Sequence, residues 1–103
     1  MFTQLENLKG KFIELGKTLA DPATMADMKR FTQLNKEYKE LSEIIRVYDE
    51  YKLLLANIDN NKLLLETEKD EDFRDLAKTD LAELEPKVAD YEANLKSLLV
   101  PKD

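Results

Sequence analysis

The sequence predicts an all-α protein. We expect an elongated antiparallel helical hairpin with a third, shorter helix packed at its base, in the manner of a coiled-coil-like three-helix bundle. Apolar residues recur three and four positions apart along most of the chain, which is the spacing that keeps them on one face of a helix. The 103 residues include only two glycines and three prolines, too few for a protein rich in strands and tight turns.

The first helix is expected at residues 2–20. Its apolar stripe consists of Leu5, Leu8, Phe12, Leu15 and Leu19. Asp21-Pro22 ends it, because the residue before a proline avoids the helical region. Both glycines of the chain, Gly10 and Gly16, lie inside this helix. They either permit close approach of a second helix or simply weaken the first.

A long helix is expected at residues 24–66, with Thr24 as its N-cap and Asp27 three positions later. Its apolar stripe contains Phe31, Leu34, Tyr38, Leu41 and Ile45, and then shifts phase to Ile44, Tyr48, Tyr51, Leu55 and Ile58. The weak helix formers at 59–61 could bend or end the helix, but the apolar spacing across them favours continuity. We expect the tyrosines to lie at the edges of the helix contacts with their hydroxyls in water.

The third helix is expected at residues 73–99, with a kink near Leu84 caused by Pro86. Its stripe is Phe73, Ala77, Leu81, Leu84, Val88, Tyr91, Leu95 and Leu98. Four acids precede or open this helix and suit its positive N-terminal end: Asp70, Glu71, Asp72 and Asp75. A calcium loop is the alternative for them, but the glycine and the alternating ligand spacing of such a loop are missing. The three helices are assigned to one domain, 1–103, which has the character of a fragment of a longer chain.

Charge and composition indicate a protein partner. The net charge is −6. The whole excess of negative charge lies after residue 52, where the sequence contains seven basic and thirteen acidic residues. Phosphate repels such a surface, so we expect no direct nucleic-acid binding. No secretory leader or bilayer-spanning apolar run is recognisable, and we therefore expect no membrane association and a soluble, cytoplasmic protein.

The sequence lacks most of the residue types and motifs that enzymes commonly use in catalysis. The chain has no histidine, no cysteine and no Gly-rich phosphate loop, so we assign no catalytic, cofactor-binding or metal residues, no cofactor and no small-molecule substrate. Small helical chorismate mutases have a similar length and helix count. They hold their substrate with inward-facing basic side chains, whereas Arg30, Arg46 and Arg74 lie off the apolar stripes here. The carboxylate pairs Glu40/Glu43 and Glu83/Glu85 also lie off the stripes, where they should be solvated.

Four segments resemble the N-terminal domain of the bacterial peptide chain release factor 1 family. They are Leu19-Ala20-Asp21-Pro22, the segment 31–41 with its F-x-x-L-x-x-E-Y-x-x-L pattern, Leu81-Ala82-Glu83-Leu84, and the closing Leu98-Leu99-Val100-Pro101-Lys102-Asp103. Val100 stands where leucine is commoner in the family. The closing segment favours factor 1 over its sister, release factor 2.

The resemblance implies a piece of a factor that terminates translation at UAA and UAG codons by triggering peptidyl-tRNA hydrolysis on the ribosome. The family's Gly-Gly-Gln loop and Pro-x-Thr codon-reading tripeptide do not occur in these residues, so no catalytic or decoding residue is carried over. In the family this domain lies near the base of the ribosomal stalk, against ribosomal protein L11 and its surroundings.

We therefore expect a non-catalytic docking module whose partner-binding residues are Lys69, Asp70, Asp72 and Phe73 at the end of the hairpin. Phe73 could instead cap the core of the hairpin. A free-standing helical hairpin that acts as a chaperone or coiled-coil adaptor is the alternative function, because composition and periodicity suit it equally well.

Overall fold

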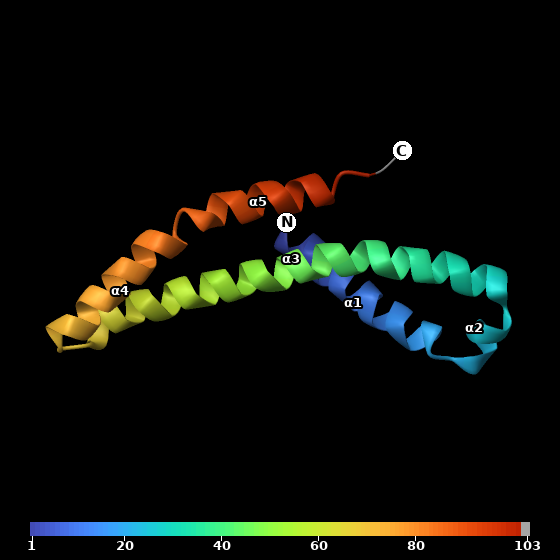
Figure 1. Cartoon of the computed structure of the whole chain (residues 1–103), viewed down its shortest axis with the longest axis horizontal. Coiled ribbons are helices and arrows are strands. Elements are labelled where there is room, and N and C mark those ends of the chain that lie inside the picture. Colours follow the sequence, from blue (N-terminus) through green and yellow to red (C-terminus); the bar gives the residue numbers. More distant parts are fainter. Residues whose placement is uncertain (102–103) are drawn as a thin grey trace. The chain divides into compact units, whose positions relative to one another are not determined.

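The computed structural model describes residues 1–101, and within that range it contains helices and no strand. The helices are α1 (Phe2–Leu19), α2 (Pro22–Ala26), α3 (Met28–Thr67), α4 (Glu71–Leu84) and α5 (Lys87–Leu98). The expected all-α class is confirmed. Contacts divide the chain into two compact units, Met1–Tyr48 and Asp49–Asp103, and α3 contributes its first half to one and its second half to the other (Figure 1). The prediction of one domain over residues 1–103 stays a prediction.

In the first unit, α1 lies antiparallel to the first half of α3. The ring of Phe2 meets the edge of Tyr48 with centroids 6.1 Å apart, and Phe12 stacks on Tyr38 at 4.5 Å. The contact partners on α3 therefore move toward its N-terminus as α1 proceeds, which is the pattern of two antiparallel helices. The buried apolar side chains of the unit are Leu5, Leu15, Leu41, Ile45, Val47 and Tyr48. All but Val47 belong to the stripes that the sequence predicts.

The long helix begins later than predicted, because a short helix precedes it. Asp21 caps α2 by accepting a hydrogen bond from the backbone N–H of Ala23 at 2.9 Å, and Pro22 occupies the first turn. Asp27 then adopts an extended conformation, and its carboxylate accepts the backbone N–H of Arg30 at 3.2 Å. Thr24 lies inside α2 and is buried. The prediction that Thr24 caps the long helix is wrong, because aspartate competes better for free N–H groups at both starts.

The two glycines of α1 differ in their surroundings. A Cβ added at Gly16 would lie 3.4 Å from the ring of Tyr38, whereas one added at Gly10 would meet nothing within 4 Å. Close approach of a second helix therefore accounts for Gly16, while Gly10 lies in a helix interior with no neighbour that requires it.

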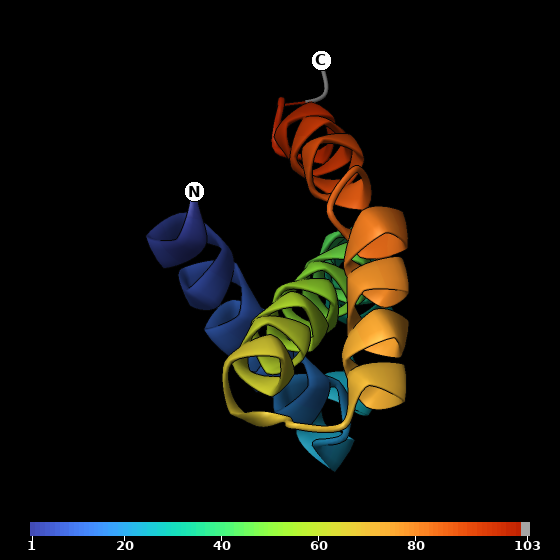
Figure 2. The same ribbon diagram turned by 90° about the vertical axis from the view of Figure 1, so that its left-hand side faces the viewer.

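In the second unit, α4 and α5 run back along the second half of α3 (Figures 1 and 2). A buried cluster of Leu54, Ile58 and Leu81 holds them together, and Leu65, Leu84, Val88 and Tyr91 pack against it. The helix continues through 59–61 as predicted. The side-chain amide of Asn61 donates to the backbone carbonyl of Asn57 at 3.0 Å, so it bonds within its own helix and does not end it.

The return arm is divided at Pro86 into α4 and α5, and α4 begins two residues before the predicted start at 73. Glu85 and Pro86 both keep right-handed helical dihedral angles, so only the hydrogen-bond ladder is interrupted. Proline has no N–H to donate, and the N–H of Val88 bonds to the carbonyl of Glu85 in a tighter turn. The change of direction visible in Figure 1 follows from this interruption.

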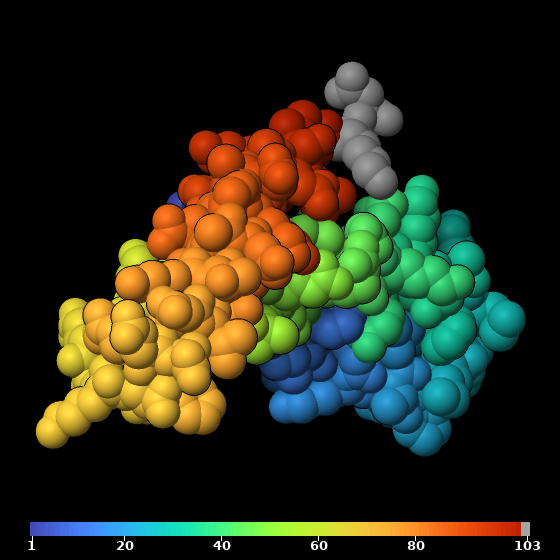
Figure 3. Space-filling view, turned by 60° about the vertical axis from the view of Figure 1, so that its left-hand side comes forward, coloured from blue at the N-terminus to red at the C-terminus, as the bar shows by residue number. Residues whose placement is uncertain are grey.

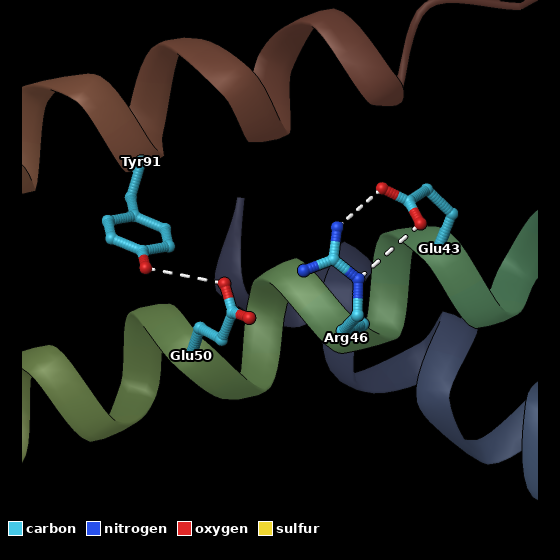
Figure 4. A network of polar contacts seen from close by, with 4 residues as sticks. All are labelled: Glu43, Arg46, Glu50 and Tyr91. Carbon is cyan, nitrogen blue, oxygen red and sulfur yellow. Dashed lines mark hydrogen bonds and ion pairs between the residues drawn. The ribbon is translucent and has the colours of Figure 1, made fainter.

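Two of the four tyrosines, Tyr48 and Tyr51, are more buried than predicted, whereas Tyr38 and Tyr91 are half-buried. Tyr48 is 1% exposed and Tyr51 is 4% exposed, so neither lies at a wet edge. Tyr91 is half-buried, and its hydroxyl donates to the Glu50 carboxylate at 3.3 Å (Figure 4). The prediction failed because two stripes of different phase meet near residue 45, which buries a wider face of α3 than either stripe alone.

Candidate partner-binding site

The tip of the second unit is the candidate site. We use this name for residues 68–76, which form the turn from α3 to α4 and the first part of α4. Figure 2 shows the chain crossing from one helix to the other there, and in the space-filling view of Figure 3 the same residues, in yellow, form the projecting end of the unit.

Two carboxylates organise the backbone of the tip. The Glu68 carboxylate accepts hydrogen bonds from the backbone N–H groups of Lys69 and Asp70, at 3.1 and 3.0 Å. The Asp70 carboxylate accepts those of Asp72 and Phe73, at 2.9 and 3.4 Å. Asp70 is therefore the N-cap of α4, and its charge also faces the positive end of that helix.

Arg74 ties the tip to the end of α3. Its guanidinium donates to the backbone carbonyl of Leu65, and to that of Glu68 at 3.3 Å. These are carbonyls at the end of α3, which lack partners within the helix. A partly buried arginine thus closes the turn, and the exposed side chains of the tip project from a fixed backbone.

All four residues that the sequence proposes for partner binding lie together at the tip and are exposed: Lys69, Asp70, Asp72 and Phe73. Phe73 is 55% exposed, so it does not cap the core of the hairpin. The prediction that it belongs to the buried stripe is wrong at this one position. Whether these residues bind a partner stays a prediction.

Two residues of the tip escaped the sequence reasoning. Leu76 is 61% exposed and follows Phe73 by one helical turn. The sequence could have predicted this exposure, because Leu76 lies off the apolar stripe of its helix and so does not face the core. Arg74 gave no comparable signal, since its partners are backbone carbonyls and depend on the conformation of the turn.

The other candidate residues of the sequence are the acid cluster, the arginines and the carboxylate pairs. Within residues 1–101, no group of three or more carboxylates is arranged to hold a metal ion. Arg46 instead pairs with Glu43 at 2.7 Å (Figure 4). The hydrogen bond from Arg46, and then its positive charge, hold the pKa of Glu43 below its usual value. The carboxylates of Glu40, Glu83 and Glu85 are exposed, as predicted. In the same described range, no helix is long and apolar enough to cross a membrane.

The closing motif of the sequence is only partly visible. Val100 is 64% exposed and Pro101 is exposed beyond the end of α5. Lys102 and Asp103 lie outside the described residues.

Comparisons with known proteins identify the family. The family model of the PCRF domain matches residues 8–103. The chain is 48% identical over its whole length to peptide chain release factor 1 of Cytophaga hutchinsonii, 50% to that of Amoebophilus asiaticus and 43% to that of Chloroherpeton thalassium. It spans 29% of the length of each of these relatives. No solved structure gives a significant match. The chain therefore belongs to the PCRF domain family and is similar to the N-terminal region of peptide chain release factor 1.

Proposed function

We propose that this chain is the N-terminal docking domain of a class I peptide chain release factor. In full length, the factor terminates translation in the cytoplasm at UAA and UAG codons by triggering peptidyl-tRNA hydrolysis on the ribosome. The similarity over all 103 residues to factors named for peptide chain release carries this proposal. It also favours this function over a free-standing adaptor.

The domain itself is non-catalytic in this proposal. Its contribution is to hold the factor on the ribosome through the tip, against ribosomal protein L11 at the stalk base. Support comes from the exposure of Lys69, Asp70, Asp72 and Phe73, and from the hydrogen bonds of Glu68 and Arg74 that fix the backbone beneath them. A preordered surface loses little conformational freedom on binding.

The test separates binding from chemistry. Peptide release from ribosomes with UAA, UAG or UGA in the A site is measured for the full-length factor and for a version that lacks residues 1–103. We expect the full-length factor to act at UAA and UAG only. The deletion should raise the concentration needed for half-maximal release and leave the rate at saturation close to that of the intact factor.

Two results would overturn the proposal. The first is a deletion variant that binds ribosomes as well as the intact factor but no longer releases peptide at saturation, because the chain would then contribute to the chemistry. The second is an intact factor that does not bind ribosomes.

A further inference from the structure

The tip carries an apolar pair on the flank of α4. Phe73 and Leu76 are one helical turn apart, so they are neighbours on the same face. They are 55% and 61% exposed. Single exposed apolar side chains are common on protein surfaces, whereas contiguous exposed apolar side chains are the feature that marks interaction sites.

The charges that border Leu76 on the surface of α4 have one sign. The positions that border Leu76 on the surface of α4, three and four residues away, are occupied by Asp72, Phe73, Thr79 and Asp80. The nearest cations of the helix, Arg74 and Lys78, are two residues from Leu76 and project from other faces. Arg74 is moreover engaged with the carbonyls of Leu65 and Glu68. Acids therefore border Leu76 on α4, and the one base near Phe73, Lys69, precedes the helix.

Helix stability accounts for only part of this acidic border. Negative charge stabilises a helix within its first turn, and Asp72 lies there. Asp80 lies in the second half of α4, outside the first turn, and the last turn of the helix contains no base. Its position beside Leu76 is not explained by the helix dipole.

We propose that Phe73 and Leu76 are an anchor pair that inserts into an apolar depression on a protein surface rimmed by lysine and arginine. The identity of the assembly that bears this surface, the ribosome, rests on the proposed function. The acidic border selects protein over RNA, because carboxylates repel a phosphate backbone and attract basic side chains. Phe73 supplies a large rigid contact area and Leu76 extends it along α4.

The experiment measures binding of the full-length factor to purified ribosomes with a stop codon in the A site. Phe73→Ser and Leu76→Ser should each weaken binding by about tenfold. Leu63→Ser is the matched control: Leu63 is 57% exposed on α3 in the same unit, but its neighbours three and four residues away are all polar. It should change the affinity by less than about twofold. All three variants should keep the thermal midpoint of the parent, since each side chain is more than half exposed.

A charge-reversed variant distinguishes the two classes of partner. Asp72→Lys combined with Asp80→Lys should slow association and weaken binding to a basic protein surface. The same variant should bind more tightly if the tip faces RNA, which would overturn the proposal. A photoreactive benzoylphenylalanine at position 76 should cross-link to protein, and a cross-link that ribonuclease removes would overturn it as well.

The two proposals fail in different ways. If the unaltered factor does not bind ribosomes, the proposed function fails. If it binds, and Phe73→Ser and Leu76→Ser bind equally well, the anchor pair alone is overturned.

Discussion

At the scale of single residues, burial changes the chemistry of Tyr51. This side chain is 4% exposed, and its ring lies 6.4 Å from that of Tyr91, centroid to centroid. Burial, and then the negative charge of Glu92, raise the pKa of Tyr51. Both causes disfavour the tyrosinate, because a buried charge loses hydration and a nearby carboxylate repels it.

The raised pKa predicts loss of stability in alkali. The pKa of Tyr51 in the folded state lies above the unfolded value of about 10. The contribution of the neutral Tyr51 side chain to the free energy of unfolding is therefore fully present below pH ~10, and it is lost as the pH rises through the folded-state pKa. Tyr51→Phe should therefore lose less stability between neutral and alkaline pH than the parent, as measured by urea unfolding. Glu92→Gln should lower the pKa seen in a tyrosinate absorbance titration. Tyr51→Phe should remove the component with the raised pKa from that titration, and loss of a component with an ordinary tyrosine pKa instead would contradict this assignment.

The two glycines of α1 give a second prediction. Gly10→Ala should stabilise the protein by about 0.5–1 kcal/mol, because alanine loses less conformational entropy in a helix and its Cβ meets no neighbour. Gly16→Val should destabilise it by about 1–3 kcal/mol, since the branches beyond Cβ would displace the ring of Tyr38. Denaturant unfolding measures both, and an equal response of the two sites would argue against the packing described for Gly16.

At the scale of elements, aspartates begin three of the five helices found in residues 1–101. Asp21 caps α2, Asp27 accepts the Arg30 N–H in the first turn of α3, and Asp70 caps α4. A helix start leaves backbone N–H groups without partners, and a short carboxylate one residue outside the helix reaches them. The acidic residues of the tip therefore have two roles: Asp70 caps α4, whereas Asp72 is exposed in the first turn of that helix and is available to a partner.

This division predicts different outcomes for substitutions of Asp70 and Asp72. Asp70→Ala should cost about 1 kcal/mol of unfolding free energy, and Asp70→Asn should retain most of it because asparagine also caps helices. Asp72→Ala should change the stability by less than about 0.5 kcal/mol. The measurement is chemical unfolding followed by circular dichroism. Equal costs at 70 and 72 would show that charge at the helix start, and not the cap, stabilises α4.

At the scale of the whole molecule, each unit has its own buried residues. The first is built on Leu5, Leu15 and Leu41, and the second on Leu54, Ile58 and Leu81. Helix α3 is shared because its apolar face changes phase along its length. The first half of α3 thus packs within the first unit, and its second half packs within the second unit.

The second core predicts a large difference between two aliphatic residues of α3. Ile58→Ala should cost about 2–5 kcal/mol, because Ile58 is 5% exposed and its removal leaves a cavity among Leu54 and Leu81. Leu53→Ala should cost less than about 0.5 kcal/mol, since Leu53 is 61% exposed. Urea midpoints measure both. Similar midpoints for the two variants would be incompatible with the cluster described here.

The sequence by itself determined the helical class, most of the buried positions and the location of the tip. The spacing of apolar residues predicts which face of a helix is buried, and acids before an apolar run predict where a helix begins. Both features can be recognised in the sequence alone. The resemblance to release factors likewise came from local segments. The position of the four proposed partner-binding residues at the tip was predictable because turns and charges are local features, and their binding of a partner stays a prediction.

Only the tertiary structure decided how the elements meet. The burial of Tyr48 and Tyr51, the exposure of Phe73 and the attachment of Arg74 to the end of α3 each depend on residues distant along the chain or on the conformation of a turn. A period of 3.6 residues assigns a side chain to a face, but the width of the face that becomes covered depends on the neighbouring helix. For that reason the sequence places Leu76 off the apolar stripe, but only the structure shows that Leu76 and Phe73 are exposed together.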